Sequence, residues 1–260
     1  RFPLMIPLEE ARTYVLDRCS RKEPIFVAVY DALGLVTAVD VIAEESIPPF
    51  ANTAMDGFAV RSSDVGVVPV ELRIIETIAA GYAPKLVVGS GEASRIMTGA
   101  PIPEGADAVV MVEKTSVKGD AVTIEAVVQA GNHIRPAGDD VTRGQLVFAR
   151  GTVLTAGHLG VLCSLGMNEI AAYPRLRVGV MSTGDELVDD GGPLAPGQIR
   201  DSNRRTLISL LNGDGFVAVD LGLIPDDETA IESALLHGAG RCDALVTSGG
   251  VSMGDFDYVK

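Results

Sequence analysis

Apolar residues recur at helical spacing at two places, one on each side of a region rich in β-forming residues. Near the start, Leu8 and Val15 fall on one face, and two glutamates in the first turn favour a helix from Pro7 onward. Further on, Thr155 is a candidate N-cap, and Gly166 lies where a helix commonly ends. The pattern predicts two helices, and we expect the first to lie on a partner surface.

The region between these helices consists of short runs rich in Val and Ile, separated by Gly, Pro and Asp. The clearest runs are residues 70–78, 108–112 and 121–128. Such runs are typical of a mainly antiparallel β unit. Because helical periodicity occurs on both sides of it, we predict that residues 47–142 are inserted into a domain built from residues 1–46 and 143–173.

Strands and helices alternate after Tyr173-Pro174-Arg175, where the proline restricts the residue before it and indicates a boundary. Strands are predicted at residues 177–181, 216–223 and 244–247, and helices at residues 204–212, closed by Gly213, and 229–237. This alternation predicts parallel strands with crossover helices in residues 174–260. The predicted fold class is therefore a multidomain α/β protein, with a mainly β inserted domain and a doubly wound α/β domain of parallel strands.

Composition and charge exclude several classes of function. The 260 residues include 21 Lys and Arg against 35 Asp and Glu, a net charge of −14, and no Trp, which is unlike a nucleic-acid binder. No apolar run approaches the roughly 18 residues that a membrane helix needs, and the first residues do not resemble an export signal. Cys19, Cys163 and Cys242 form no CxxC pair, which favours a reducing compartment. We predict a cytoplasmic protein that binds neither nucleic acid nor membranes.

Polar, glycine-containing or acidic segments directly follow each predicted strand of the α/β domain. They are residues 182–186 (STGDE), 225–227 (PDD) and 248–257 (SGGVSMGDFD). Ligands of open α/β sheets bind at the carboxyl ends of the strands, so we expect these segments to form one site. Glycines and hydroxyls offer hydrogen-bond donors to phosphate, whereas the carboxylates would repel it unless Mg²⁺ lies between them. The segments therefore predict a Mg²⁺-assisted reaction at a phosphate ester or anhydride.

Simpler interpretations stay open for several of these residues. Asp226 and Asp227 are also suited to cap a helix, and Gly249-Gly250 is also suited to a turn. The β unit contributes polar segments of its own, at residues 48–60, 98–101 and 135–140, each of which is also typical of an ordinary loop. The three histidines lack the spacing of metal ligands, so we interpret them as surface or packing residues.

Six landmarks, taken in order, resemble one family. They are Met55-Asp56-Gly57-Phe58-Ala59-Val60, Met97-Thr98-Gly99-Ala100, Gly138-Asp139-Asp140, residues 182–187, Asp201-Ser202-Asn203 and residues 248–260. Their order and combination are similar to those of the MoeA and gephyrin E-domain family, the molybdopterin molybdenumtransferases. The resemblance covers essentially the whole chain.

The resemblance implies a fold and a reaction. Enzymes of this family use Mg²⁺ to cleave the adenylyl link of adenylylated molybdopterin, insert molybdate, and release molybdenum cofactor and AMP. The implied fold has an elongated domain in two parts (1–46 and 143–173), an inserted β domain (47–142) and a molybdopterin-binding α/β domain (174–260). A C-terminal barrel follows in the family, so we expect this chain to be a fragment that needs the remainder for full activity. An upstream molybdopterin adenylyltransferase is the implied supplier of substrate.

The resemblance also implies a homodimer in which the β domain of one subunit faces the α/β domain of the other. Catalytic roles are expected for Asp56, Thr98, Asp140, Glu186 and Asp257. Asp226 and Asp257 follow different strands and are expected to hold Mg²⁺ directly or through water. Substrate contacts are expected from Arg135, Ser182, Thr183, Gly184, Asp185, Ser248, Gly249, Gly250, Ser252 and Gly254.

Two other classes of function compete with the enzyme. The first is an interaction scaffold, because the related gephyrin domain also clusters membrane receptors. The second is a stand-alone pterin- or nucleotide-binding module. The complete set of acids at the strand ends favours the enzyme, since a scaffold has no need for carboxylates beside phosphate loops. Asp56 and Asp140, which precede the α/β domain, argue against a stand-alone module.

Overall fold

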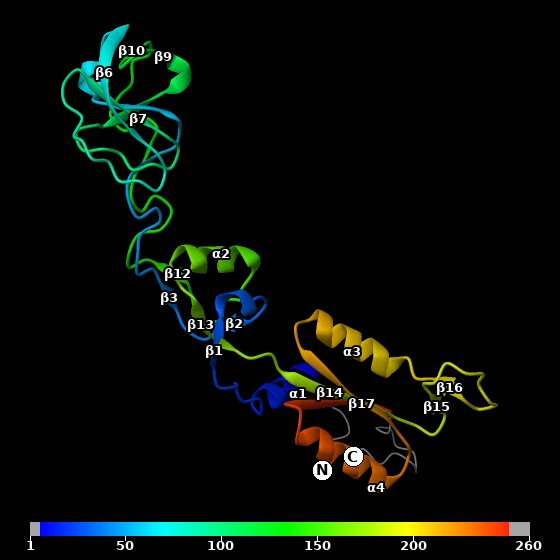
Figure 1. Cartoon of the computed structure of the whole chain (residues 1–260). Helices are drawn as coiled ribbons and strands as arrows, with labels where there is room; N and C mark the ends of the chain where they lie inside the picture. The colour runs from blue at the N-terminus through cyan, green and yellow to red at the C-terminus, as the bar shows by residue number, and fades with distance from the viewer. Residues whose placement is uncertain (1–5, 250–260) are drawn as a thin grey trace. The chain divides into compact units, whose positions relative to one another are not determined.

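The computed structural model describes residues 6–249. Contacts divide this part of the chain into two compact units: residues 6–27, 32–38 and 171–249 form the first, and residues 28–31 and 39–170 form the second (Figure 1). The predictions made for Gly250, Ser252, Gly254 and Asp257 lie outside the described residues. No helix in the described part is long and apolar enough to cross a membrane.

The second unit is built around a six-stranded sheet of order β8-β5-β7-β6-β10-β9. Its strands are β5 (Gly57–Val60), β6 (Val70–Ile78), β7 (Glu92–Ile96), β8 (Ala108–Met111), β9 (Thr115–Lys118) and β10 (Ala121–Ile124). All neighbours pair antiparallel except β6 and β7, which confirms the predicted mainly antiparallel unit. Phe58 of β5 belongs to one buried apolar cluster and its neighbour Ala59 to another. Both faces of β5 are therefore covered, which explains its unbroken apolar run.

Strands on the two flanks of the β-rich region pair with each other. β3 (Val41–Ile42) pairs antiparallel with β12 (Leu146–Phe148), and β2 (Val36–Thr37) pairs antiparallel with β13 (Glu169–Tyr173). β13 lies between β1 (Ile25–Ala28) and β2 in a three-stranded sheet. Such pairing brings the two flanks together, as an inserted β domain predicts, and the proposed domain boundaries stay a prediction.

The two helices predicted from periodicity are present. α1 (Leu8–Leu16) begins after Pro7, and none of its residues is buried. α2 (Ala156–Ser164) has Thr155 as its N-cap: the Thr155 hydroxyl accepts from the backbone N–H of His158, and the His158 ring accepts from that of Thr155. Gly166 follows with a φ of 72°, as a helix C-terminus favours.

The remaining short elements connect these parts. They are β4 (Asn52–Thr53), β11 (Ile134–Arg135), β15 (Leu187–Val188), β16 (Ile199–Arg200) and the 3-10 helices Val29–Asp31, Ser62–Asp64 and Val112–Lys114. β4 pairs antiparallel with β11, and β15 pairs parallel with β16.

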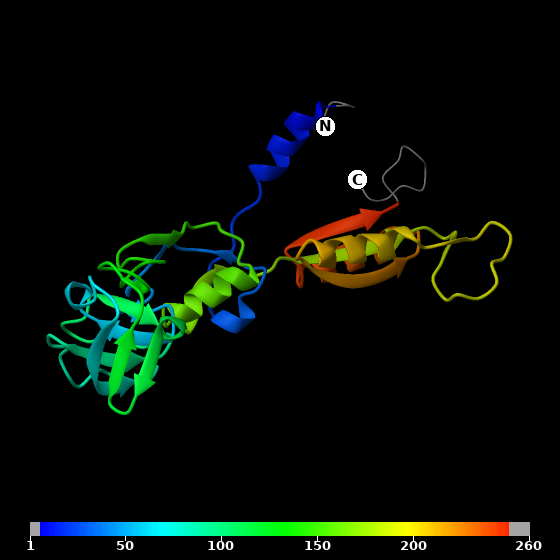
Figure 2. The ribbon, with the colours of Figure 1, turned by 90° about the horizontal axis from the view of Figure 1, so that it is seen from above.

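In the first unit, β14 (Arg177–Thr183) pairs parallel with both β17 (Val217–Ile224) and β18 (Ala244–Ser248). α3 (Asn203–Gly213) packs on β14 and β17, and α4 (Glu228–Ala239) packs on β17 and β18. The two helices cover opposite faces of the sheet (Figures 1 and 2). This arrangement confirms the α/β part of the predicted fold class.

The end of α3 differs from the prediction. Gly213 is still helical, Asp214 is the C-cap, and Gly215 adopts the left-handed conformation with a φ of 86°. The helix includes Gly213 because glycine permits the left-handed conformation but does not require it, and Gly215 supplies that conformation instead.

Candidate active site

The carboxyl end of β14 lies where the strand order reverses. The chain runs from β14 to β17 on one side and then crosses to β18 on the other. A crevice at such a switch point is where open α/β sheets bind ligands. Ser182 of β14 is in register with Ser248 of β18, so the segments after these two strands meet there.

Gly249 fits tightly against β14. Its φ is 100°, and a Cβ at this position would collide with the backbone carbonyl of Thr183. Only glycine accommodates both the conformation and this approach. The backbone after β18 therefore lies directly on the end of β14, as expected for the two polar segments.

The acidic segment after β17 joins the same edge. The backbone N–H of Asp226 donates to a carboxylate oxygen of Asp185 at 3.1 Å, and that of Gly184 donates to the carbonyl of Ile224 at 3.4 Å. Glu186 is exposed beside Asp185. The structure thus brings the three strand-end segments together, while the chemical roles assigned to them stay predictions.

The two hydroxyls at the end of β14 differ in their hydrogen bonding. Ser182 is fully buried and donates to Oδ1 of Asp201 at 3.0 Å, so its proton is used inside the fold. Thr183 is only 3% exposed, yet within residues 6–249 its hydroxyl has no hydrogen-bond partner. Because a buried hydroxyl without a partner is costly, the Thr183 hydroxyl points to a bound ligand or water.

The helix-cap interpretation holds for one of the two adjacent acids. The side chain of Asp227 accepts from the backbone N–H of Ala230 at 2.8 Å and caps α4. Asp226 is half-buried and does not cap this helix. Its carboxylate remains the candidate for metal binding.

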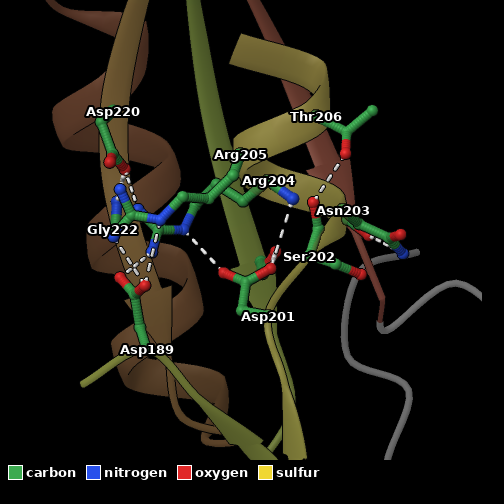
Figure 3. Close-up of polar contacts among 11 residues, drawn as sticks. Asp189, Asp201, Ser202, Asn203, Arg204, Arg205, Thr206, Asp220 and Gly222 are labelled. Carbon is green, nitrogen blue, oxygen red and sulfur yellow. Dashed lines mark hydrogen bonds and ion pairs between the residues drawn. The ribbon is translucent and has the colours of Figure 1, made fainter. Parts of the chain in front are cut away.

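Sequence reasoning missed an ion cluster around the buried Arg204, behind this edge (Figure 3). The Arg204 guanidinium contacts three carboxylates: Asp201 at 2.7 Å, and Asp189 and Asp220 in closer contacts. Burial lowers the pKa of Arg204, but hydrogen bonds to the three carboxylates outweigh it and raise that pKa above its ordinary value. The sequence signal for the cluster was the spacing of Asp201 and Arg204. Residues three apart lie on the same side of a helix, so this spacing could have predicted the ion pair.

The same helix start is tied to β18. The Asn203 side-chain amide donates to the Ser248 hydroxyl at 3.0 Å. Burial raises the pKa of Asp201, but hydrogen bonds from Arg204 and Ser182 overcome this and hold it below its ordinary value. Asp201 is therefore ionised at neutral pH.

In the second unit, Asp56 and Thr98 form a polar pair. The backbone N–H and the hydroxyl of Thr98 both donate to Oδ1 of Asp56, each at 2.7 Å. The hydroxyl, followed by the backbone N–H, holds the pKa of Asp56 below its ordinary value. Asp56 is thus an exposed, ionised carboxylate in a defined orientation.

Arg135 and Asp140 form the second pair of this unit. Nη2 of Arg135 lies 2.8 Å from the Asp140 carboxylate, and Nε lies 3.6 Å from that of Asp139. The hydrogen bond to Asp140 raises the pKa of Arg135. Arg135 also pairs with Asn52 across β11 and β4, and the adjacent Thr53 bonds to the Gly99–Ala100 backbone. The polar segments predicted in the β unit therefore lie close together.

The Mg²⁺ site stays a prediction. Among residues 6–249, no cluster of three or more His, Cys, Asp or Glu side chains is placed to hold a metal ion. Mg²⁺ commonly takes one or two carboxylates and completes its shell with water and substrate phosphate. Asp226 and Asp185 provide carboxylate oxygens at this edge, which are the type of ligand that Mg²⁺ prefers.

Comparisons with known proteins agree along the chain. Residues 6–166 match the family model described as the MoeA N-terminal region (domain I and II), and residues 179–260 match that of a probable molybdopterin binding domain. The chain is 40% identical over 258 residues to the molybdopterin molybdenumtransferase of Haemophilus influenzae, covering 98% of this chain and 64% of that protein. It is 40% identical over 260 residues to molybdopterin molybdenumtransferase 2 of Mycobacterium tuberculosis, covering 98% of this chain and 64% of that protein.

A solved structure gives the same result. The crystal structure of the molybdopterin biosynthesis moeA protein from Pyrococcus horikoshii OT3 superposes with a TM-score of 0.84 at 32% identity, covering 94% of this chain and 66% of that one. This chain spans about 64% of the length of the two curated relatives.

Proposed function

The chain belongs to the MoeA family, and we propose that it acts in molybdenum cofactor biosynthesis as a molybdopterin molybdenumtransferase. In this proposal the substrates are adenylylated molybdopterin and molybdate, the reaction depends on Mg²⁺, and AMP is released. Names of the relatives and the match to a molybdopterin binding domain support the substrate class. The proposed location is the cytoplasm.

The observation that carries the proposal is the edge of the α/β sheet at its switch point. Thr183 offers a buried hydroxyl that has no partner among residues 6–249, and Gly249 lets the neighbouring backbone approach it closely. A hydroxyl of this kind is suited to donate to an anionic oxygen of a phosphate group. The carboxylates of Asp185, Glu186 and Asp226 surround the same edge, so a phosphate binds there only if a cation offsets their charge.

Mg²⁺ fits this requirement. Asp226 would hold it together with Asp257, which lies outside the described residues. When bound, Mg²⁺ neutralises charge on the phosphate oxygens and orients the phosphoanhydride for cleavage. Glu186 is exposed at the same edge, where its carboxylate is available to accept a proton or to order a water molecule.

The polar groups of the β unit support a second half of the site. Asp56 presents an oriented, ionised carboxylate held by Thr98, and Arg135 is a permanent cation held by Asp140. We propose that a homodimer completes each site, with the β unit of one subunit contributing to the α/β unit of the other. A molybdopterin adenylyltransferase would supply the substrate, because the adenylyl group must be attached before it is cleaved.

The test is an AMP-release assay with the full-length protein, adenylylated molybdopterin, molybdate and Mg²⁺. We expect AMP release that stops when Mg²⁺ is chelated and that falls strongly in Glu186→Gln. The Haemophilus influenzae molybdopterin molybdenumtransferase is the positive control. Molybdopterin binding without AMP release would support a non-catalytic pterin-binding module instead, and the absence of both would overturn the proposal.

A further inference from the structure

Arg204 joins three separate elements of the α/β unit (Figure 3). Its guanidinium contacts Asp189 after β15, Asp201 before α3 and Asp220 in β17. The side chains of Arg204 and Asp201 are 3% and 1% exposed. Arginine suits this place because its planar fork offers several N–H donors in fixed directions.

A short chain of hydrogen bonds leads from Arg204 to the switch point. Oδ2 of Asp201 accepts from Nε of Arg204, and Oδ1 accepts from the Ser182 hydroxyl and from the backbone N–H of Arg204. Ser182 immediately precedes Thr183, whose hydroxyl has no partner in the described chain. The orientation of Asp201 therefore influences where the end of β14 lies.

A second chain leads from the same helix start to β18. Asn203, next to Arg204 in α3, donates to the Ser248 hydroxyl. Ser248 immediately precedes Gly249, which packs on Thr183. The guanidinium thus lies behind both strand ends that form the crevice, while Arg204 itself is buried and offers nothing to a ligand directly.

Stability alone does not explain such a cluster. Replacing a buried ion pair with well-packed apolar side chains is often neutral or stabilising, because removing charges from water is costly. The planar guanidinium, however, has N–H donors in fixed directions, so it sets the positions of its carboxylate partners more narrowly than apolar packing does. We propose that Arg204 is a positioning residue for the molybdopterin-binding edge, which it holds through Asp201 and Ser182 on β14 and through the start of α3 on β18. This inference rests on the proposed function for the identity of the ligand.

The test compares Arg204→Lys with Arg205→Lys in the full-length protein. Lysine keeps the charge at position 204 but lacks the fork that reaches three carboxylates. Arg205 is the matched control, because it is adjacent, is 62% exposed and contacts only Asp189 within the cluster. Should Arg204→Lys fail to fold, Asp220→Asn removes one outer partner whose side chain is 45% exposed.

Two readouts separate positioning from support of the fold. Hydrogen exchange without substrate should be faster in Arg204→Lys at residues 182–187 and 244–249 and unchanged in the β unit. Titration with molybdopterin should show a Kd raised roughly tenfold or more, with the same number of binding sites per folded protein. A merely structural role would lower the folded fraction and leave the Kd unchanged. Arg205→Lys should match wild type in both measurements.

The outcomes are distinguishable. Exchange and Kd in Arg204→Lys equal to those of Arg205→Lys would overturn the positioning role. A reduced folded fraction with an unchanged Kd would overturn it as well. If the wild-type protein neither binds molybdopterin nor releases AMP, the proposed function fails, and the exchange data alone then decide whether Arg204 positions the strand ends.

Discussion

Asp56 and Thr98 illustrate how one hydroxyl can set the state of a carboxylate. The two donors of Thr98 stabilise the ionised form, so the pKa of Asp56 in the folded protein is below its value in the unfolded chain. Such a group stabilises the fold at a pH above the unfolded pKa, and this stabilisation is lost as the pH falls through the folded pKa.

Thr98→Val should therefore raise the pKa of Asp56 toward its ordinary value, because the hydroxyl donor is lost while the backbone donor remains. An NMR titration of the Asp56 carboxyl carbon measures this directly. Thr98→Ser keeps the hydroxyl and should retain the low pKa. Equal pKa values in the valine and serine variants would show that the hydroxyl is not the cause.

Asp226 and Asp227 are neighbours with separate expected roles, which makes them a matched pair. Asp226→Asn should raise the Mg²⁺ concentration needed for half-maximal AMP release by about tenfold or more, because a charged oxygen ligand is lost. Asp227→Asn should change it little, since Asn also caps a helix and the contact to Ala230 can be kept. A similar response of the two variants to Mg²⁺ would remove Asp226 from the metal site.

Gly57 shows how one strand depends on its neighbour. β5 pairs with β8, and a Cβ on Gly57 would overlap the backbone carbonyl of Val110. The backbone carbonyl of a paired strand cannot move aside as a flexible side chain can. The glycine next to Asp56 is therefore needed to let the two strands pair.

Gly57→Ala should destabilise the β unit by at least about 2 kcal/mol, as overpacking of a buried site does. Urea denaturation followed by a probe in this unit measures the loss in the free energy of unfolding. Gly66→Ala is the control, because nothing lies within 4 Å of a Cβ there. Comparable unfolding midpoints for the two variants would contradict the close approach.

Most elements were predictable because their signals are local. The run Val70–Ile78 is a strand with the predicted bounds, and Thr155 caps α2 as its position before an apolar helix suggested. The end of α3 was placed one residue early, because Gly213 and Gly215 are both plausible terminators and only the observed backbone shows that Gly215 adopts the left-handed conformation that follows the helix.

The proposed homodimer makes a quantitative prediction for the molecule as a whole. If each site takes Asp56 from one subunit and Glu186 from the other, mixing inactive Asp56→Ala and Glu186→Ala proteins should restore activity. Random exchange makes half of the dimers mixed, and each of these has one intact site of two, so about a quarter of wild-type activity is expected. AMP release after verified subunit exchange is the measurement.

Each variant assayed alone is the control for this experiment and should stay inactive. Recovery well below a quarter in a mixture with verified exchange would mean that Asp56 and Glu186 do not act across subunits. The pairing of Asp56 with Thr98 and of Asp185 with Asp226 would still hold within each chain.

The sequence by itself determined the element order, the acidic strand ends and the ordered landmarks of the family, because these are encoded in neighbouring residues. Tertiary structure decided what neighbouring residues cannot encode. Ser182 and Thr183 carry adjacent hydroxyls, yet only the folded chain brings Ser182 to Asp201 and leaves the Thr183 hydroxyl without a partner in the described part of the protein. The Arg204 cluster likewise depends on carboxylates from three elements that meet only when the sheet and its helices assemble, since ion pairs form by distance in space and not by spacing along the chain.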